Sequence, residues 1–321
     1  MSRPSIIVTG LSPDRRNTNS RIRTAVTEGA KESGLFSSVD QKAIEVVTAS
    51  DDIASDIVFA VGGGAEDTVQ FEQLYRKAKA AGATVVFWTH EDPYEFDLNH
   101  RLLDYCDWFL TNERSALPYY ESPRTGWLPL GADQSFAREV IPFRNREIDM
   151  FFCGYGYPLR LHILERIVAS PAQNFNLAIF GPNLEETLGR YASERRLSTA
   201  EMAETCAHSR LTLNIGRDLD IANNRFNIIP ETPGPRTFDV ALSGAPQIMF
   251  DDGVDIDHFY ERGKEILMFD NAGEIEGHIK ALQEDPDLGE RIARAAKERT
   301  EREHLYSHRV TKMMEIIGAG G

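Results

Sequence analysis

Short runs of apolar, often β-branched residues recur along the chain at regular intervals. They are Ile6–Val8, Ile57–Val61, Thr84–Trp88, Trp108–Thr111, Met150–Cys153, Leu177–Phe180, Leu211–Ile215, Gln247–Phe250 and Ile266–Phe269. Most of these runs lack the strict polar alternation of a half-exposed strand. We therefore expect strands that are buried on both faces of parallel sheets.

Between most of the runs lie stretches with apolar residues at helical spacing. Val69–Ala81 is one, and Gly82 is a natural stop for it. Another begins at Ser198, where Glu201 three positions later completes a capping box that satisfies the first main-chain N–H groups. Alternating strands and helices of this length predict doubly wound α/β sheets.

A break in the alternation divides the chain. Ala137–Arg146 carries a proline, mixed charges and no periodic pattern, which is typical of a linker, and Asp149–Gly156 then reads as a new first strand ending in a glycine turn. We expect Rossmann-like domains in residues 1–140 and 141–303, with a helix in 304–321 that returns to the first domain. Two such domains facing each other leave a central cleft at the carboxyl ends of their strands, where open α/β sheets bind ligands.

Composition and charge narrow the class of protein. Of the 321 residues, 41% are hydrophobic and 26% charged, which is ordinary for a globular protein. The net charge of −15 repels nucleic acid and anionic membranes on average, so no nucleic-acid partner is expected. No run approaches the roughly 20 apolar residues of a membrane span, and the apolar stretch near the N-terminus is too short for a signal peptide, so none is expected. We expect a cytoplasmic protein without an integral membrane segment.

The most informative segment is Pro230–Pro246, which contains a proline–glycine turn before an apolar helix. A helix N-terminus is a natural phosphate site, and Arg236 would add a charged fork beside it. Asp239, one turn further on, could accept two hydrogen bonds from a ribose. The alternative is a plain helix start in which Arg236 and Asp239 form an i,i+3 pair. Both interpretations stay open on chemistry alone.

This segment resembles the signature of GT-B glycosyltransferases, in particular the group similar to the spore-maturation protein CgeB. In that group a P-x-R-x-F-E-A-x-x-x-G-x-P-like segment opens the donor-binding helix. Pro235, Arg236, Phe238, Asp239, Gly244 and Pro246 are in register with it, although Asp239 stands where the group usually has glutamate. Glu231 precedes Asp239 by eight positions, similar to the E-x7-E acid pair of many retaining members.

Other segments that resemble the group follow in the same order. They are Trp88–Tyr94, Cys106–Asn112, Leu128–Asp133, Phe152–Arg160, Ile179–Gly181, Leu213–Gly216 and Glu303–Arg309. The resemblance implies a GT-B fold and a hexosyl- or related transferase that needs no metal and no cofactor. Its partners would be a nucleotide-diphosphate sugar and an unidentified acceptor hydroxyl on a small molecule, glycan or protein.

The resemblance also implies roles for individual residues. Arg160 and Arg236 would stabilise the departing diphosphate, where negative charge grows in the transition state. Asp239 would hold the ribose and Glu231 would face the sugar. The remaining donor-binding candidates lie at strand ends or at the helix start, and they are Gly154, Phe180, Gly181, Asn214 and Thr237.

His90, Glu91 and Asp92 end an apolar run of the first domain. His90 could deprotonate the acceptor with Asp92 orienting it, or the acids could cap a helix while His90 only packs. Asp14 is a weaker acceptor-side candidate. Together with Glu95 and Asp97, Glu91 and Asp92 form an acidic cluster that would repel phosphate and suit sugar hydroxyls or an amine, unless these acids are solvated residues at a helix start.

Three further features have simpler explanations. Asp218–Asp220 and Asp255–Asp257 have the D-x-D spacing of a metal site but arise readily in an acidic chain. Gly62–Gly64 could cradle phosphate, yet it lacks a G-x-G-x-x-G pattern and is interpreted as a turn. Cys106, Cys153 and Cys206 form no ligand cluster, so no metal is expected. A nucleotide-sugar epimerase of the same fold and a non-catalytic sugar-nucleotide-binding protein remain the alternative functions.

Overall fold

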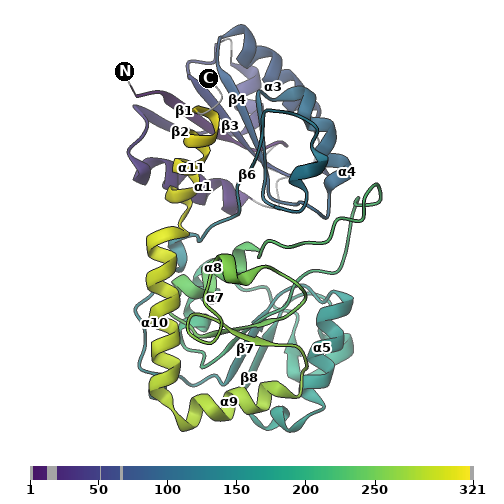
Figure 1. Ribbon diagram of the computed structural model, residues 1–321, viewed down its shortest axis with the longest axis vertical. Helices are drawn as coiled ribbons and strands as arrows, with labels where there is room; N and C mark the ends of the chain where they lie inside the picture. Colours follow the sequence, from purple (N-terminus) through teal and green to yellow (C-terminus); the bar gives the residue numbers. More distant parts are fainter. Residues whose placement is uncertain (1–2, 13–19, 51, 66–67, 319–321) are drawn as a thin grey trace. The chain divides into compact units, whose positions relative to one another are not determined.

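A computed structural model describes residues 3–12, 20–50, 52–65 and 68–318. The described chain forms two compact units (Figure 1). Unit 1 comprises Met1–Leu130, Asp220–Thr232 and Tyr306–Gly321, and unit 2 comprises Gly131–Leu219 and Pro233–Leu305. Asp14 lies outside the described residues.

Unit 1 is built on a parallel sheet of six strands in the order β2-β1-β3-β4-β5-β6. The strands are β1 (Ser5–Thr9), β2 (Ser38–Gln41), β3 (Ile57–Gly62), β4 (Thr84–Thr89), β5 (Trp108–Thr111) and β6 (Thr125–Trp127). The helices are α1 (Ser20–Ser33), α2 (Ile44–Ala49), α3 (Val69–Ala80), α4 (Phe96–Asn99) and α11 (Tyr306–Gly318), with 3₁₀ turns η2 (His100–Tyr105) and η3 (Leu117–Tyr119). The strand order reverses between β1 and β3.

Unit 2 repeats this plan with a parallel sheet in the order β12-β11-β10-β7-β8-β9. Its strands are β7 (Met150–Cys153), β8 (Leu177–Phe180), β9 (Ala192–Ser193), β10 (Thr212–Asn214), β11 (Gln247–Phe250) and β12 (Leu267–Phe269). Its helices are α5 (Pro158–Val168), α6 (Glu185–Leu188), α7 (Thr199–Ala207), α8 (Pro235–Leu242), α9 (Glu274–Glu284) and α10 (Pro286–Glu303). Short 3₁₀ turns are η4 (Gln134–Phe136), η5 (Phe143–Asn145), η6 (Pro171–Asn174), η7 (Gly189–Tyr191) and η8 (Ile256–His258). The order reverses between β7 and β10, so this is the point where a doubly wound sheet binds its ligand.

Local signals in the sequence explain where several helices begin and end. Ser198 and Glu201 form the capping box expected at the start of α7, with the serine hydroxyl accepting from the Glu201 N–H. Gly82, at φ 80°, follows the end of α3, and Gly244, at φ 70°, follows the end of α8. Left-handed φ angles cost glycine little, so both residues stop their helices cleanly.

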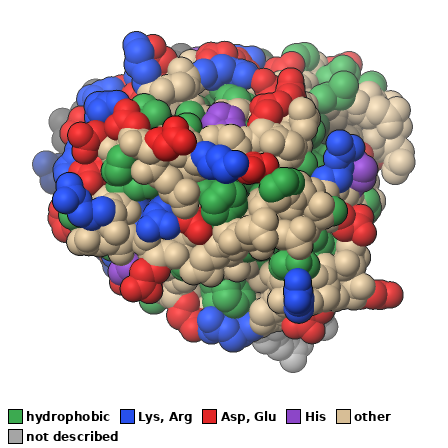
Figure 2. All heavy atoms as spheres, turned by 90° about the horizontal axis from the view of Figure 1, so that it is seen from below, with side chains coloured by type: hydrophobic (Ala, Val, Ile, Leu, Met, Phe, Trp, Pro, Cys, Tyr) green, Lys and Arg blue, Asp and Glu red, His purple; other side chains and the backbone are tan. Residues whose placement is uncertain are grey.

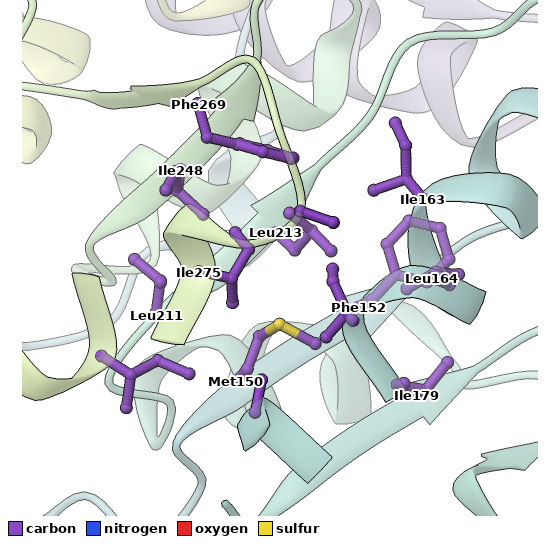
Figure 3. Packing of buried hydrophobic residues seen from close by; sticks show 14 of the residues in the cluster. Met150, Phe152, Ile163, Leu164, Ile179, Leu211, Leu213, Ile248, Phe269 and Ile275 are labelled. Carbon is purple, nitrogen blue, oxygen red and sulfur yellow. The ribbon is translucent and has the colours of Figure 1, made fainter. Parts of the chain in front are cut away.

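Apolar layers on the sheets form the cores. In unit 2, Met150, Phe152, Ile179, Leu213 and Ile248 point from four neighbouring strands into one packed cluster (Figure 3). These residues come from the runs without polar alternation. Phe151, which lies between Met150 and Phe152 on β7 and so points to the opposite face, is also fully buried, in agreement with the prediction of strands enclosed on both faces.

Charged side chains of both signs share the surface. They are interspersed on the face seen in Figure 2. Exposed helical pairs, such as Glu276 with Lys280 and Arg294 with Glu290, lie one turn apart. Pairs of this kind contribute only about 0–1 kcal/mol each, so they solvate the helices more than they stabilise them.

The chain returns to unit 1 through helix α11, which packs along α1 (Figure 1). Tyr306 meets Trp88 edge to face, with ring centroids 6.1 Å apart, and Val310 and Met313 are buried in the same apolar cluster. The Arg309 Nε donates to the Leu130 carbonyl at 3.0 Å. This helix therefore covers one face of the first sheet.

The division of the chain differs from the expected one in two places. Unit 2 begins at Gly131, before the linker expected at residues 137–146, and Asp220–Thr232 returns to unit 1 between β10 and α8. Strands β2, β6 and β9 were also absent from the sequence pattern. They have two to four residues and lack a buried apolar run, so periodicity gives no signal for them.

Gly29 in α1 allows α11 to approach closely. A Cβ there would lie 2.6 Å from the main-chain carbon of Tyr306, whereas a Cβ at Gly277 in α9 would meet nothing within 4 Å. We expect Gly29→Ala to destabilise unit 1 by about 1–3 kcal/mol through overpacking. We expect Gly277→Ala to be neutral or stabilising by up to about 1 kcal/mol, because alanine favours helix.

Urea unfolding measures both effects. The three tryptophans, Trp88, Trp108 and Trp127, all lie in unit 1, so their fluorescence reports that unit and circular dichroism reports both. Equal midpoints for Gly29→Ala and the unmodified protein would contradict the close packing of α1 on α11.

Candidate functional site

The carboxyl ends of β7, β8 and β10 bring the predicted donor-side residues of unit 2 together. Gly154 follows β7, Gly181 follows β8, and Asn214 ends β10. These strands are neighbours, with β7 between β8 and β10. The reversal of strand order thus coincides with the predicted residues.

Glycine is required where the turns after β7 and β8 meet. A Cβ at Gly181 would lie 1.9 Å from the Gly154 carbonyl oxygen, and one at Gly156 would lie 2.1 Å from the Asn183 carbonyl oxygen. The Gly154 N–H donates to the Phe180 carbonyl at 3.0 Å. The two turns therefore pack main chain against main chain, which leaves little bulk at this edge of the sheet.

Arg160, in the first turn of α5, reaches across the carboxyl end of β10. Its Nε lies within hydrogen-bond distance of the carbonyl oxygens of Ile215, at 3.1 Å, and Gly216, at 3.0 Å. The guanidinium carbon also sits 5.0 Å from the centre of the Tyr157 ring. These contacts fix the direction of the arginine before any ligand arrives.

Arg236 lies in the first turn of α8, and its Nη1 donates to the Cys153 carbonyl at the end of β7, at 2.7 Å. The residue before the helix is Gly234, which is exposed and has no side chain to cap the first N–H groups. The expected features of an anion site, a helix N-terminus and an adjacent arginine, are therefore present.

Three other predicted donor residues form internal hydrogen bonds. The Asn214 Nδ2 donates to the Thr237 hydroxyl at 2.8 Å, joining β10 to α8. Asp239 is completely buried, and its Oδ1 accepts the Asp133 N–H at 2.9 Å. Its carboxylate ties the 131–133 stretch to α8, and its contact with a ribose stays a prediction.

Phe180 and Asp252 also lie at the carboxyl edge of the unit 2 sheet. Phe180 ends β8, with the Arg195 guanidinium carbon 5.3 Å from its ring centre. Asp252 follows β11, and a Cβ at Gly216 would lie 2.2 Å from its Oδ2. Burial raises the Asp252 pKa above its usual value. Sequence reasoning missed Asp252, although its place directly after a buried strand was an available signal.

In unit 1, Asp92 is the centre of a buried hydrogen-bond network. It is 2% exposed, and its carboxylate accepts from the Asn99 amide at 2.6 Å and from the Thr111 and Tyr120 hydroxyls at 2.6 and 2.7 Å. Burial raises its pKa to about 6, against the lowering effect of these hydrogen bonds. Asp92 therefore holds the end of β4 to its neighbours, which is a supporting role.

His90, two residues earlier, is 8% exposed, with its Nε2 3.5 Å from the Glu91 Oε1. Burial lowers its pKa to about 4, so the imidazole is neutral at physiological pH. The neutral imidazole is the form that can accept a proton, although a base with so low a pKa is a weak one.

The acidic cluster that was expected to face an acceptor is mostly committed to the main chain. The Glu95 Oε2 accepts the Ala65 N–H at 3.0 Å, and the Asp97 Oδ2 accepts the Asn224 N–H at 2.7 Å. Glu95 is buried, and both acids bond within unit 1. These two are thus neither free acceptor-binding acids nor merely solvated residues at a helix start.

The glycines Gly62–Gly64 also have structural explanations. Side chains at these positions would collide with Leu11, with the acids Glu91 and Glu95, and with the main chain at Leu98. The Gly64 N–H already donates to the Asn99 Oδ1 at 2.6 Å. The N–H groups that a phosphate would need are therefore partly used, in agreement with a turn.

Glu231 lies on unit 1, with its Oε2 3.4 Å from the Arg114 Nη2, while Asp239 lies on unit 2. The two acids of the E-x7-E-like spacing are consequently held by different units. Sequence reasoning missed Arg114 and its neighbour Glu113, and no local pattern marks either of them.

The D-x-D triplets are candidate metal ligands, and two of their aspartates have partners within the protein. Within the described ranges, no group of three or more His, Cys, Asp or Glu side chains is arranged to hold a metal ion. The Asp218 Oδ2 accepts the Leu159 N–H at 2.8 Å, and Asp257 pairs with Arg262. No helix in the described part of the chain is long and apolar enough to cross a membrane.

Two parallel six-stranded sheets, each in its own α/β unit, define the GT-B fold of glycosyltransferases. The protein is similar over 98% of its length to HepE from Anabaena in complex with UDP and glucose, with a TM-score of 0.66, 11% identity and all of that chain covered. Sucrose-phosphate synthase from Thermosynechococcus elongatus gives a TM-score of 0.64 and 11% identity, over 99% of this chain and 100% of that one.

Residues 160–315 match the family described as glycosyl transferase-like. The spore protein CgeB of Bacillus subtilis is 23% identical over 187 residues, which are 53% of this chain and 57% of CgeB. The match thus spans little more than half the length of that relative. The resemblance to GT-B glycosyltransferases of the CgeB-like group, inferred from the sequence, is confirmed.

The raised pKa of Asp92 makes a prediction about stability. The folded state favours the protonated carboxyl, so its contribution is fully present below pH 3.8 and is lost as pH rises through about 6. We expect the free energy of unfolding of the unmodified protein, relative to Asp92→Asn, to fall by about 2 kcal/mol between pH 4 and 7.

Urea unfolding followed by tryptophan fluorescence at several pH values measures this difference. Thr111→Val removes one hydrogen bond but keeps the carboxyl, so it should retain the pH slope relative to Asp92→Asn. A flat or rising difference between the unmodified protein and Asp92→Asn would show that the pKa of Asp92 is not raised in the folded state.

Proposed function

We propose that the protein is a glycosyltransferase that moves a sugar from a nucleotide-diphosphate donor to an acceptor hydroxyl and needs no divalent metal. The observation that carries this proposal is that Arg160 and Arg236 donate to carbonyl oxygens at the carboxyl ends of two adjacent strands, β10 and β7, with Arg236 in the first turn of α8. The glycosyl transferase-like family match and the GT-B fold support a transferase.

The chemistry of the site fits a departing diphosphate. Negative charge grows on the leaving oxygen as the bond to the sugar breaks, and groups already aimed at that position stabilise it at little reorganisation cost. Main-chain carbonyls orient both arginines, and the first N–H groups of α8 add a positive dipole end. These groups would do electrostatically what a bound cation does in other transferases.

The other donor residues are assigned around this centre. Gly154 and Gly181 leave room for the ligand at the strand ends, Phe180 would contact the base, and Asp239 would bind the ribose. Asn214 and Thr237 hold each other in place at the start of α8. Glu231 would contact the sugar hydroxyls.

On the acceptor side, His90 is the candidate base, and Asp92 would act by holding the β4 end in place. The acceptor would be a hydroxyl of a small molecule, glycan or protein. A nucleic acid is disfavoured as the acceptor, because the net charge of −15 would repel its phosphates.

UDP-glucose is the first donor to test, because HepE has been solved with it and with UDP. We expect a matching nucleotide sugar to raise the melting temperature, by a stabilisation of about 2.7 kcal/mol at a hundredfold excess over Kd. We also expect slow release of nucleoside diphosphate in excess chelator. Conversion into a second nucleotide sugar would indicate an epimerase, and binding without turnover a non-catalytic protein.

Activity that strictly requires added magnesium or manganese would overturn metal independence and make the D-x-D triplets candidate metal ligands again. An absence of binding across a panel of nucleotide sugars would overturn the donor site itself.

Arg236→Ala should weaken binding of the nucleoside diphosphate roughly ten- to hundredfold, because a charge-assisted hydrogen bond is worth about 1.5–3 kcal/mol. Calorimetry with UDP measures the change. Arg166→Ala, an exposed arginine of α5, is the control and should bind normally. Unchanged affinity in a folded Arg236→Ala protein would remove Arg236 from the site.

A further inference from the structure

Three arginines of unit 2, Arg160, Arg217 and Arg236, contact one short turn, residues 153–157, that follows β7. Arg236 and Arg160 donate to main-chain carbonyls of this turn, at 2.7 and 3.3 Å. Arg217 lies against the Tyr157 ring, with its guanidinium carbon 5.5 Å from the ring centre. Arg217 belongs to none of the sequence segments that suggested the donor site.

Arg160 and Arg217 share this tyrosine. The guanidinium carbon of Arg160 lies 5.0 Å from the centre of the Tyr157 ring, close to the value for Arg217. The negative face of an aromatic ring attracts a cation, so one side chain holds both arginines. The two like charges are near neighbours as a result, and their mutual repulsion is relieved when an anion joins them.

The turn that carries Arg217 is docked on the start of α5. The Arg160 Nε lies within hydrogen-bond distance of two carbonyls of this turn, and the Asp218 Oδ2 accepts the Leu159 N–H at 2.8 Å. The Arg217 Nε donates to the Leu219 carbonyl, also at 2.8 Å. These contacts fix the position of the Arg217 guanidinium from within unit 2.

The three arginines lie at the edge of the sheet where a ligand is expected. The strand order reverses between the neighbouring strands β7 and β10, and open α/β sheets bind ligands at the carboxyl ends of such strands. All three side chains are half-buried, so a ligand can reach them while water screens them less than it screens a fully exposed charge. Cations gathered at this edge, in a protein with a net charge of −15, indicate an anion site.

The chemistry of sugar transfer gives a third cation a specific task. Each phosphate of a nucleotide sugar carries a negative charge. When the bond between the sugar and the diphosphate breaks, its electron pair stays on the phosphate oxygen and adds a further charge. A transferase that uses no metal must meet this new charge with groups of its own.

We propose that Arg217 binds the donor diphosphate together with Arg160 and Arg236, and that it receives the charge that appears when the sugar leaves. This inference rests on the proposed function, but it needs only residues of unit 2. Free diphosphate, which already carries the added charge, should therefore depend on Arg217 more than the intact nucleotide sugar does.

Calorimetry with inorganic pyrophosphate, UDP and UDP-glucose tests this dependence. We expect Arg217→Met to weaken binding of pyrophosphate and UDP about tenfold or more and binding of UDP-glucose about threefold or less, because a charge-assisted contact is lost mainly from the free diphosphate. Arg217→Lys keeps the charge without the planar fork and should recover part of the loss. Arg166→Met, at an exposed arginine of α5, is the control and should bind as the unmodified protein does.

The salt dependence of pyrophosphate binding separates a lost ion contact from a displaced turn. Sodium chloride screens each contact between opposite charges, so the affinity of Arg217→Met should fall less steeply with added salt than that of the unmodified protein. A slope equal to that of the unmodified protein would assign Arg217 a structural role only and contradict the proposal.

The remaining outcomes distinguish this inference from the proposed function. Unchanged affinity for pyrophosphate and UDP in a folded Arg217→Met protein would overturn the inference, and turnover of a nucleotide sugar would then leave the transferase standing. Equal losses for UDP and UDP-glucose would reject the assignment of Arg217 to the departing charge. Pyrophosphate binding that depends on Arg217, in a protein that turns over no nucleotide sugar, would support the anion site and reject the transferase. An unmodified protein that binds neither pyrophosphate nor UDP would refute both.

Discussion

At the carboxyl edge of each parallel sheet, the main-chain N–H and C=O groups that follow the last hydrogen bond between strands need other partners. The side chains that serve as these partners determine the charge of that edge. In unit 2 the partners are arginines: Arg160 and Arg236 donate to carbonyl oxygens at the ends of β10 and β7. In unit 1 they are carboxylates: Glu95 accepts the Ala65 N–H, and Glu113 accepts the N–H groups of Ser115 and Thr232. The same requirement is thus met by opposite charges.

This difference would explain how an acidic protein binds the anionic donor that we propose. The net charge of −15 describes the whole chain, but the arginines at the switch point of unit 2 act over a few ångströms, well within one Debye length of about 8–10 Å. The acids of unit 1 are largely occupied by main-chain groups. A cluster of acidic residues in the sequence is therefore a poor guide to the charge of a ligand when their carboxylates accept main-chain N–H groups of turns.

Local signals made the fold largely predictable from the sequence. Long apolar runs marked β3, β4 and β7, and the Ser198–Glu201 box marked the start of α7, because each depends on residues close together in the chain. The contacts of Glu113 could not be predicted in this way. Glu113 and Thr232 are 119 positions apart, and neither lies in a periodic pattern. The predicted donor-side residues Gly154, Gly181 and Asn214 lie at the ends of adjacent buried strands, which is a local feature too, and their contact with a donor stays a prediction.

Residues 220–232 belong to unit 1 although they lie in the sequence between two segments of unit 2, so domains cannot always be predicted as consecutive stretches of sequence. A boundary search finds changes of pattern, but this segment has no pattern, and only its hydrogen bonds to Tyr94 and Glu113 assign it to unit 1. Its acid Glu231 therefore belongs structurally with β5 and not with α8, although it precedes α8 by only a few residues.

The packing of α11 on α1 also has a consequence for the order in which the protein can fold. Synthesis runs from the N-terminus, so the sheet of unit 1 leaves the ribosome long before the residues that cover it. Until Tyr306, Val310 and Met313 arrive, the apolar face formed by Phe59 and Trp88 has only part of its final cover. Unit 2 is complete first, although its chain begins later. During synthesis, the sheet of unit 1 therefore gains its full apolar cover only after the C-terminal helix α11 has been made.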